Sequence, residues 1–313
     1  MSNNQLNIIV SICCITYNHA PFIRKALDGF LMQQAPSCVP QGVKMSDWCE
    51  ILIHDDCSTD GTKEIVKEYA ARYPDLIFPL YEEENKYSKG VKVDFYNYNR
   101  AKGKYIAYCE GDDYWTEPRK LQWQVDFMEA HSEYSVCFHR IKHHNIYTNV
   151  YTDDNCGNLL KDKEEVDIVN EIFFKGWYTQ PLSMLFRMSM FDLHWKDMYK
   201  YYRDMHEIYH LLTIGKGRLL PFYGGIHIIH RGGIASMISR ELNFKNAYDI
   251  ATELYEVNKD PNVQEYYVAT LQWIVDSNHF ISKVKKLSYI FRIFTINHSV
   301  KHLVRNIRRL LKK

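Results

Sequence analysis

The segment Tyr105–Trp115 constrains the fold of this 313-residue chain more than any other stretch. It opens with a short apolar run that is typical of a buried β-strand and then changes abruptly to Glu110-Gly111-Asp112-Asp113. Such a strand places its polar end at the carboxyl edge of a sheet, where open α/β sheets bind ligands. Adjacent carboxylates repel one another unless a cation or a hydrogen-bond donor lies between them. The stretch therefore predicts a solvated turn or a cation-binding turn at a sheet edge.

The residues before this segment favour the cation-binding turn, because they repeat a pattern of strand, polar turn and helix. Ile8–Ile15 and Glu50–His54 predict buried strands, and polar turns follow them at Thr16–Pro21 and Asp55–Thr62. Leu76–Tyr81 predicts a third strand. Alternating strands and helices indicate a parallel sheet with crossover helices, so the polar turns are expected to meet in one crevice.

The second half of the chain predicts more α/β structure and then helices. The expected strands are Tyr134–Ile141, Pro181–Arg187 and Leu219–Ile229, and the expected helices begin at Glu117 and cover Val166–Phe174 and Asp204–Ile214. The stretch Tyr147–Glu165 is polar and irregular, and the pattern beyond Ser236 is helical to the end.

Charge is distributed unevenly along the chain. The net charge of +1 gives no overall field that would recruit nucleic acid. Ser277–Lys313, however, contains ten Lys and Arg residues and no Asp or Glu. Within it, Val300–Lys313 places apolar and basic residues on different sides of a helix. This tail is expected to lie on an anionic membrane surface or to pack on the rest of the chain with a solvated basic face.

The cellular location follows from what the sequence does not contain. Residues 1–7 have no signal-peptide layout, and no apolar run approaches the ~20 residues that span a bilayer. We expect a cytoplasmic protein that is peripheral on the inner face of the cell membrane if its basic tail binds lipid.

Three motifs in order along the chain carry a family resemblance. They are Val10-Ser11 with Thr16-Tyr17-Asn18, Asp55-Asp56 with Ser58-Thr59-Asp60-Gly61-Thr62, and Ala101–Ile106 with Gly111-Asp112-Asp113. With these motifs, each after a predicted strand, the chain resembles family 2 glycosyltransferases of the GT-A fold over residues 7 to 236. The string Cys109–Gln122 is similar to the bacterial branch that builds capsule, lipopolysaccharide O-antigen and related surface glycans.

The resemblance implies an α/β fold of the GT-A, Rossmann-like type, with a mixed, mainly parallel sheet flanked by helices. Residues 1–236 would form the glycosyltransferase domain, in which about 1–120 is the nucleotide-sugar half and 121–236 the acceptor half. Residues 237–313 would form a helical C-terminal extension that ends in the basic amphipathic tail.

The resemblance also implies a donor site built from the first polar turns. Tyr17 would stack on the nucleotide base, with Thr16 and Asn18 beside it, and a flat aromatic face at a strand end suits that contact. Asp56 would accept a hydrogen bond from a uracil imide, and Asp112 would lie near the ribose. The alternative role for Asp56 is helix capping, for which Ser58 and Asp60 are better placed.

In the same family a divalent cation bridges the two phosphates of the donor. Asp113 would hold Mn²⁺ or Mg²⁺, and His230 fits the late histidine that approaches the metal or the diphosphate. A cation there neutralises the charge that develops on the departing diphosphate. Lys89 is a candidate for a further phosphate contact, with a solvated loop lysine as the alternative.

The resemblance implies that an acidic residue at the start of a helix deprotonates the acceptor hydroxyl. Asp204 occupies that place, although this chain reads Arg203-Asp204-Met205-His206-Glu207 where the family often has an acidic pair or Gly-Asp-Trp. Glu207 is a rival, because residues three apart share one face of a helix. Helix capping is the alternative role for Asp204.

The resemblance therefore implies an inverting, metal-dependent transferase. It would move a sugar from a nucleotide-diphosphate sugar, most simply a UDP-sugar, to a hydroxyl of a glycan or lipid-linked saccharide. The alternative is a non-catalytic nucleotide-sugar-binding or scaffold protein on the same fold. A dinucleotide-dependent oxidoreductase is disfavoured because no Gly-x-Gly-x-x-Gly turn follows the first strand.

Overall fold

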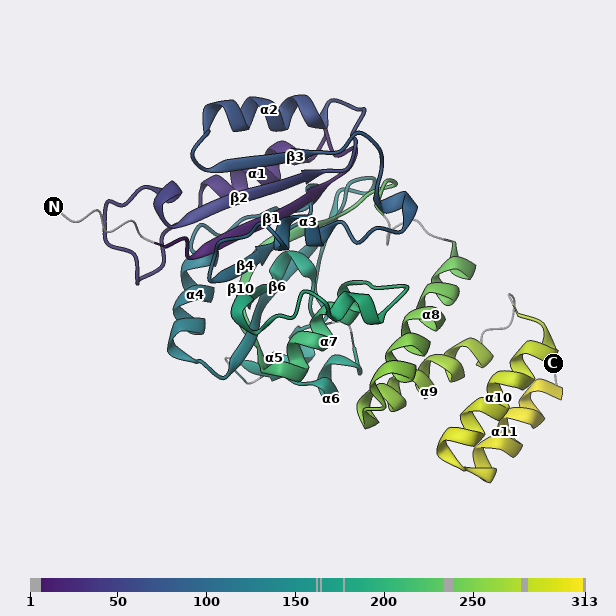
Figure 1. Ribbon diagram of the computed structural model, residues 1–313. Coiled ribbons are helices and arrows are strands. Elements are labelled where there is room, and N and C mark those ends of the chain that lie inside the picture. Colours follow the sequence, from purple (N-terminus) through teal and green to yellow (C-terminus); the bar gives the residue numbers. More distant parts are fainter. Residues whose placement is uncertain are drawn as a thin grey trace. The chain divides into compact units, whose positions relative to one another are not determined.

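The computed structural model describes residues 7–161, 163, 165–176, 178–233, 239–276 and 281–311 (Figure 1). The β-strands are β1 (Val10–Thr16), β2 (Cys49–Asp55), β3 (Ile77–Tyr81), β4 (Tyr105–Tyr108), β5 (Tyr114–Trp115), β6 (Tyr134–Asn145), β7 (Val150–Asp153), β8 (Val166–Ile168), β9 (Leu185–Arg187) and β10 (Lys216–Ile229). The α-helices are α1 (Ile23–Leu31), α2 (Thr62–Arg72), α3 (Asp94–Tyr98), α4 (Lys120–Ala130), α5 (Gly157–Leu160), α6 (Asn170–Phe173), α7 (Asp204–Ile214), α8 (Arg240–Asn258), α9 (Pro261–Asp276), α10 (Lys283–Asn297) and α11 (Val300–Leu311). Short 3-10 helices are η1 (Met45–Asp47), η2 (Tyr87–Lys89), η3 (Pro181–Ser183), η4 (Met188–Met190) and η5 (Trp195–Met198).

The strands of the described part form one mixed sheet. Its order is β3-β2-β1-β4-β9-β6-β10-β5, with β7 beside β6 and β8 beside β10. The pairs β2–β3, β1–β2, β1–β4 and β6–β10 are parallel, and β9 joins the two parallel sections by antiparallel pairing with β4 and β6. The predicted mixed, mainly parallel sheet with flanking helices and a helical C-terminal region is confirmed.

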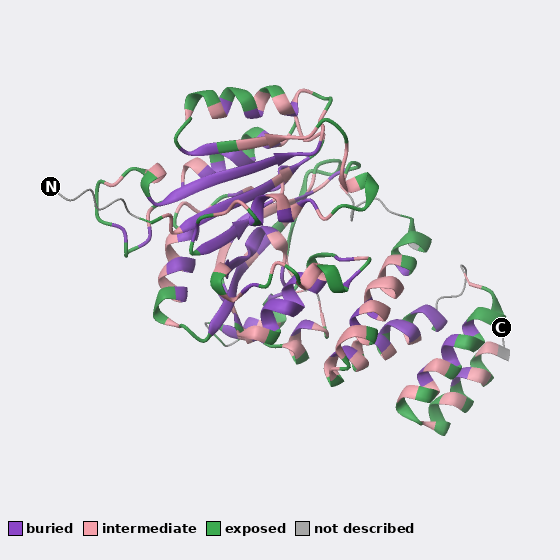
Figure 2. Cartoon of the chain, viewed as in Figure 1, coloured by how far each residue is buried: buried purple, intermediate pink, exposed green. Residues whose placement is uncertain are grey.

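The main core forms where one face of the sheet meets α1, α2 and α4. Val10, Ile12 and Cys14 alternate along β1 and pack in one cluster with Ile23 and Phe30 of α1. This alternation follows from the period of two in a strand, whereas the helix contributes residues at helical spacing. Figure 2 shows the consequence, because the central strands are buried along their length and α2 keeps an exposed outer side.

The chain divides into two compact units. One contains Met1–Lys196 and Glu207–Ser236, and therefore the whole sheet. The other contains Asp197–His206 and Met237–Lys313. No pattern in the sequence indicated that residues 197–206 group with the C-terminal helices. The expected domain boundary at Ser236 and the last two residues of the basic tail lie outside the described residues.

Some predicted elements differ from the structure. The helix expected over Val166–Phe174 begins with strand β8, which pairs with β10, and only Asn170–Phe173 is helical. The strand expected over Pro181–Arg187 begins with the 3-10 helix η3 and is extended only at β9. In both segments the apolar run is too short for its period to distinguish strand from helix.

Lys120, the first residue of α4, has an ammonium group buried in the core. Its Nζ has no hydrogen-bond partner in the described part of the chain and lies 3.7 Å from the centroid of the Trp115 ring. Burial disfavours the charged form and lowers the pKa of Lys120 to about 7, although nearby thiols and the aromatic ring favour the charge.

We expect Lys120→Met to stabilise the protein. Because the pKa of Lys120 is lowered on folding, the unfolded chain binds more protons between about pH 7 and 10.5, and the free energy of unfolding rises with pH across that window. The substitution should raise this free energy by on the order of 2–4 kcal/mol near pH 7 and below, and should flatten the rise. Urea unfolding at several pH values measures both effects.

The matched control is Lys67→Met on α2, where the side chain is exposed. It should change neither the free energy of unfolding nor its pH dependence appreciably. If Lys120→Met has the same free energy of unfolding as the wild type, with the same dependence on pH, burial of the Lys120 ammonium does not destabilise the protein.

Candidate active site

The polar turns after β1, β2 and β4 meet at one edge of the sheet, as the sequence predicts. Thr16, the last residue of β1, is in register with Asp55, the last residue of β2. The backbone N–H of Gly111, after β4, donates to the carbonyl of Ile15 at 2.9 Å, and that of Asp56 donates to Thr16 at 2.9 Å. These three turns therefore form one connected surface.

Side chains of the second turn hold the first turn in place. The backbone N–H of Asn18 donates to Ser58 Oγ at 2.9 Å, and Asn18 Oδ1 accepts from the N–H of Thr59 at 2.8 Å. Asp60 accepts hydrogen bonds from the N–H groups of Ala20 and Thr62. The Asx and Ser residues thus cross-connect the loops, which is a common use of such side chains.

Gly111 permits the close approach of the turn after β4 to the turn after β1. A Cβ atom at this position would lie 2.7 Å from Thr16 Oγ1 and 2.9 Å from Ile23 Cδ1. Any larger residue would push the acidic pair that follows away from β1. Close packing therefore explains why glycine occupies position 111, which the motif alone does not explain.

Asp113 points into the protein. It is buried, and its Oδ1 accepts a hydrogen bond from the backbone N–H of Ile228 on β10 at 2.8 Å. Burial, with the charges of Asp112 and Glu110, raises the pKa of the Asp113 carboxyl well above its usual range. The contact ties the turn after β4 to strand β10.

Asp112 faces two histidines. Its Oδ2 lies 2.9 Å from His230 Nε2 and 3.5 Å from His19 Nε2, and its Oδ1 is buried with no hydrogen-bond partner among the described residues. Burial favours the neutral acid, but the hydrogen bond from His230 and the charges of both histidines hold the pKa of Asp112 below its ordinary value. Burial also lowers the pKa of His19, against the opposing charge of Asp112.

The structure therefore pairs His230 with Asp112, the carboxylate that the sequence analysis placed near the ribose, and not with Asp113. His19 was not predicted as a site residue at all. Only its position in the turn after the first strand could have identified His19. Its contact with Asp112 spans 93 residues of sequence, and the contact of His230 with Asp112 spans 118, so neither contact is visible in a local pattern.

This cluster has an incomplete set of metal ligands. In the part of the chain that the structure describes, no three His, Cys, Asp or Glu side chains are arranged to hold a metal ion. Mg²⁺ is usually bound by one or two carboxylates together with substrate phosphates, so a site of this kind is completed by its substrate. The unpartnered Oδ1 of Asp112 and the two imidazole rings beside it fit such a site.

The residues predicted to contact the nucleotide differ in their exposure and in the hydrogen bonds that they already make. Tyr17 is 45% exposed, whereas Thr16 is buried and its Oγ1 has no hydrogen-bond partner in the described residues. Both carboxylate oxygens of Asp56 accept hydrogen bonds from backbone N–H groups, from Lys86 at 2.8 Å and Tyr87 at 3.0 Å. Asp56 thus fixes the η2 segment, a contact that sequence reasoning missed.

Lys89 lies on η2, and its ammonium forms an exposed ion pair with Glu84. Glu84 also pairs with Lys86 at 2.8 Å. Because such exposed pairs contribute little stability, this pairing does not prevent Lys89 from exchanging Glu84 for another anion.

Helix α7 carries the two candidate bases, and it begins at Asp204 as predicted. Asp204 is exposed, and its Oδ1 accepts a hydrogen bond from the N–H of Met205 at 2.8 Å. Glu207 is buried and accepts a hydrogen bond from the hydroxyl of Tyr98 at 2.8 Å. Asp204 belongs to the compact unit with the C-terminal helices, and Glu207 belongs to the unit with the sheet.

With this geometry in view, the comparisons with known proteins identify the family. The model described as "Glycosyl transferase family 2" matches residues 11–196. The chain belongs to glycosyl transferase family 2.

Relatives in the family agree over part of their length. The chain is 44% identical to an uncharacterized protein of Mycobacterium bovis, Mb1547, over 134 residues, which cover 42% of the chain and 35% of that protein. It is 33% identical to TuaG of Bacillus subtilis, whose name refers to teichuronic acid biosynthesis, over 40% of the chain and 43% of TuaG. These matches therefore span less than half of each relative.

Solved structures match over almost the whole chain. TarS residues 1–349 of Staphylococcus aureus, in complex with UDP-GlcNAc, is similar with a TM-score of 0.62 and 16% identity, covering 92% of this chain and 81% of that one. The mannosyltransferase PcManGT of Pyrobaculum calidifontis, in complex with GDP-Man and Mn²⁺, gives a TM-score of 0.54 and 15% identity, with coverages of 98% and 88%. At these identities the matches establish the GT-A fold.

The connection between the first two turns generates a stability prediction. Asn18 has a φ of +55°, in the left-handed region, so Asn18→Ala should both remove its acceptor for Thr59 and strain the backbone. We expect the free energy of unfolding to fall by about 1–3 kcal/mol, measured by urea denaturation.

Asn18→Gly is the control, because it loses the same side-chain hydrogen bonds but tolerates a positive φ. It should lie between Asn18→Ala and the wild type. Equal stability of all three proteins would contradict the role of Asn18 in bracing the turns.

Proposed function

We propose that this protein is an inverting glycosyltransferase that uses a nucleotide-diphosphate sugar as donor. The observation that carries the proposal is the Asp112 carboxylate held between His19 and His230, at the sheet edge where the exposed Tyr17 also lies. Family membership supports the reaction class, and the carboxyl edge of a parallel sheet is where such folds bind nucleotides.

The donor is proposed to be a UDP-sugar. Tyr17 would stack on the base, with Thr16 and Asn18 shaping the turn beneath it. Asp56 would accept from the uracil imide, which is compatible with its present hydrogen bonds because a carboxylate has about four acceptor sites and two are in use. A guanine base offers a different donor pattern, so Asp56 is the proposed origin of nucleotide selectivity.

A divalent cation, Mn²⁺ or Mg²⁺, fits the cluster and would be held by Asp112 and His230. The sequence-based choice of Asp113 is less suited, because its Oδ1 is engaged by Ile228 and its surroundings disfavour the ionised form. When bound, the cation supplies electrostatic stabilisation of the diphosphate leaving group. His19 lies beside the Asp112 carboxylate and would orient it while His230 turns to the cation. Lys89 lies in the segment that would supply a further positive charge to the phosphates.

Asp204 is proposed as the general base that removes the proton from the acceptor hydroxyl. It is exposed, and a base must reach the hydroxyl directly. Attack by that oxygen on the face opposite the diphosphate breaks the bond to the phosphate oxygen and inverts the anomeric carbon. Glu207, buried and hydrogen bonded to Tyr98, is proposed as a positioning residue for α7.

The acceptor is proposed to be a hydroxyl of a glycan or of a lipid-linked saccharide in cell-surface polysaccharide synthesis. The name of TuaG supports this class, as does the similarity of Cys109–Gln122 to enzymes of capsule and lipopolysaccharide synthesis. In the described residues no helix is both long enough and apolar enough to cross a membrane.

The direct test of this function is release of UDP from a panel of UDP-sugars, with GDP-sugars as controls, in the presence of Mn²⁺. The proposal expects turnover with at least one UDP-sugar, as hydrolysis or as transfer to a glycan acceptor. Tight donor binding with no turnover under any condition would favour the non-catalytic alternative.

The metal assignment predicts different behaviour for the two adjacent carboxylates. Asp112→Asn should abolish the additional thermal stabilisation that Mn²⁺ gives in the presence of UDP, because the cation loses its charged ligand. Asp113→Asn should retain most of it, since an amide oxygen can still accept from Ile228. The opposite result would restore Asp113 as the ligand.

The base assignment predicts a separation of binding from turnover. Asp204→Asn should lower kcat by on the order of 10²–10⁴ and leave the affinity for UDP unchanged. Glu207→Gln should lower kcat by less, because its amide oxygen can still accept the hydrogen bond from Tyr98, and Tyr98→Phe, which removes that hydrogen bond, should also lower kcat by less than Asp204→Asn does. If Glu207→Gln is the more damaging change and Tyr98→Phe is not, Glu207 is the base.

A further inference from the structure

Helices α10 and α11 leave apolar side chains exposed. On α10, Val284, Leu287 and Phe291 are 80%, 36% and 48% exposed. On α11, Val300 and Val304 are 62% and 40% exposed. These two helices, the last in the described chain, pack against one another. Figure 2 shows exposed residues on both. We call these five side chains the outer apolar set.

On α10 this set is separate from the face that packs in the core. Val284, Leu287 and Phe291 follow the spacing i, i+3 and i+7, so they form one stripe along the helix. Tyr289, Ile290 and Ile293 face the other way and are buried in the core of the C-terminal helices. The folding of this unit therefore does not require the exposed stripe.

Helix α11 uses only part of its apolar surface for packing. Leu303, Ile307 and Leu310 pack against the core of the C-terminal helices, and buried Asn306 donates to Gln272 of α9 at 2.8 Å. The sequence alone left open whether this helix binds a membrane or packs on the chain. In the structure it packs through these residues and leaves Val300 and Val304 exposed.

Cations without acidic partners accompany the exposed residues. Ser277–Lys313 has no Asp or Glu, so its ion pairs need partners from elsewhere: Arg292 of α10 pairs with Glu256, and Arg309 of α11 pairs with Asp276. Five exposed cations in this part of the chain make no ion pair within the described residues, namely Lys283, Lys285, Lys301, Arg305 and Arg308. Like charges gathered without counter-ions repel one another, and a negative surface relieves that repulsion.

On α11 the apolar and basic residues are neighbours. Lys301, Arg305 and Arg308 follow one side of the helix, and Val300 and Val304 lie next to them, so that together they line a shallow hollow. A side-by-side arrangement of valine and arginine suits a boundary between lipid headgroups and acyl chains, where long basic side chains reach the phosphates.

We propose that the outer faces of α10 and α11 bind the surface of an anionic lipid bilayer. The outer apolar set enters the headgroup region, and Lys283, Lys285, Lys301, Arg305 and Arg308 contact lipid phosphates. An acidic polymer in solution would match the charge but gives no role to Val284 and Phe291. The proposal does not rest on the donor site, so vesicle binding and nucleotide binding can fail independently.

The consequence for function is a gain in local concentration. A lipid-linked acceptor is confined to the bilayer, and a chain that lies on the same bilayer meets it far more often than one in free solution. Each cation near such a surface contributes additively, and none forms a permanent anchor, so the association is reversible and sensitive to salt.

The test is cosedimentation of the full chain with vesicles of phosphatidylglycerol and phosphatidylcholine, compared with vesicles of phosphatidylcholine alone. The wild type should bind the first, release at high salt and not bind the second. Val284→Ser with Phe291→Ser, and separately Lys301→Gln with Arg305→Gln and Arg308→Gln, should each lower the partition coefficient by about tenfold or more.

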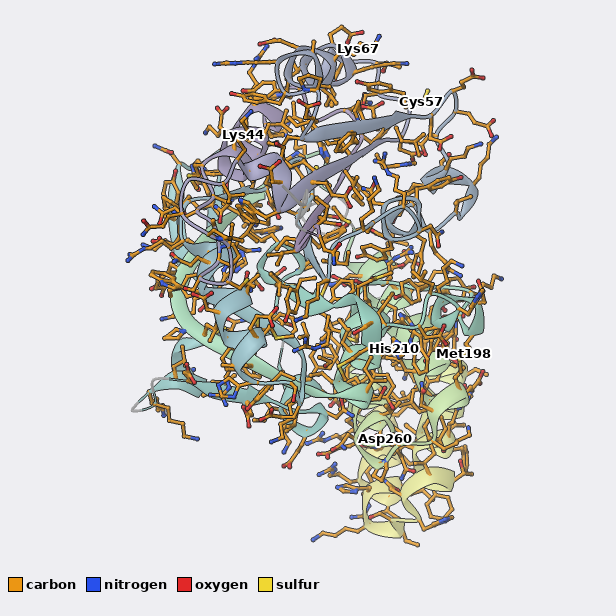
Figure 3. The ribbon with its side chains drawn as sticks, turned by 60° about the vertical axis from the view of Figure 1, so that its left-hand side comes forward. Lys44, Cys57, Lys67, Met198, His210 and Asp260 are labelled. Atoms are coloured by element: carbon orange, nitrogen blue, oxygen red, sulfur yellow. The ribbon has the colours of Figure 1, made fainter. Side chains whose placement is uncertain are left out.

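Matched controls come from exposed residues of the sheet-containing unit. The apolar control is Val150→Ser with Phe78→Ser, whose side chains are 51% and 37% exposed. The charge control is Lys44→Gln with Lys67→Gln and Lys102→Gln, which removes the same charge from exposed positions. Figure 3 labels Lys44 and Lys67. Both control proteins should bind vesicles as the wild type does, and circular dichroism should confirm that every variant is folded.

Three outcomes overturn the proposal. The first is a wild type that does not sediment with anionic vesicles in low salt. The second is loss of binding by the charge variant alone while Val284→Ser with Phe291→Ser keeps it, which is the behaviour of a site for an acidic polymer. The third is conversion of an oligomer to a monomer by the apolar variant with no effect on sedimentation, which assigns the stripe to a second copy of the chain.

Discussion

The hydrogen bond from the Ile228 N–H to Asp113 is the interaction on which the rest of the site depends. It draws the turn after β4 against β10 and directs Asp113 into the protein, whereas the adjacent Asp112 points to His19 and His230. Gly111 makes the same turn fit against Thr16. Asp112 is thereby presented to His230, which directly follows the end of β10. The position of Asp112, the candidate metal ligand, is thus set by the contacts of the turn with β10 and β1 and does not require a bound metal.

The nucleotide side of the site is also assembled before any donor arrives. Asn18 and Asp60 connect the first two turns, and Asp56 holds the η2 segment through two backbone amides. A site whose loops are already ordered loses less conformational entropy on binding. Tyr17 is the exception, because its side chain is exposed, which fits the proposed stacking on a nucleotide base.

The sequence predicted what depends on local pattern. Buried runs identified β1, β2, β3 and β4, and the start of α7 at Asp204 was correct. The short strand β8 was predicted as helix because the identity of such a run is decided by its pairing with β10. The different surroundings of Asp112 and Asp113 could not be read from adjacent identical residues, since they depend on Ile228, 115 residues from Asp113, and on His230. His19 was missed for the same reason.

The most direct test of the central claim is isothermal titration of the wild-type protein with UDP, with and without Mn²⁺, alongside GDP and TDP. The account predicts that UDP binds at least about tenfold more tightly with Mn²⁺, because a cation at Asp112 and His230 joins the protein to the diphosphate, and that GDP and TDP bind more weakly. Binding of UDP that ignores Mn²⁺ would contradict the metal site. If no nucleoside diphosphate binds under either condition, the proposed transferase function is wrong.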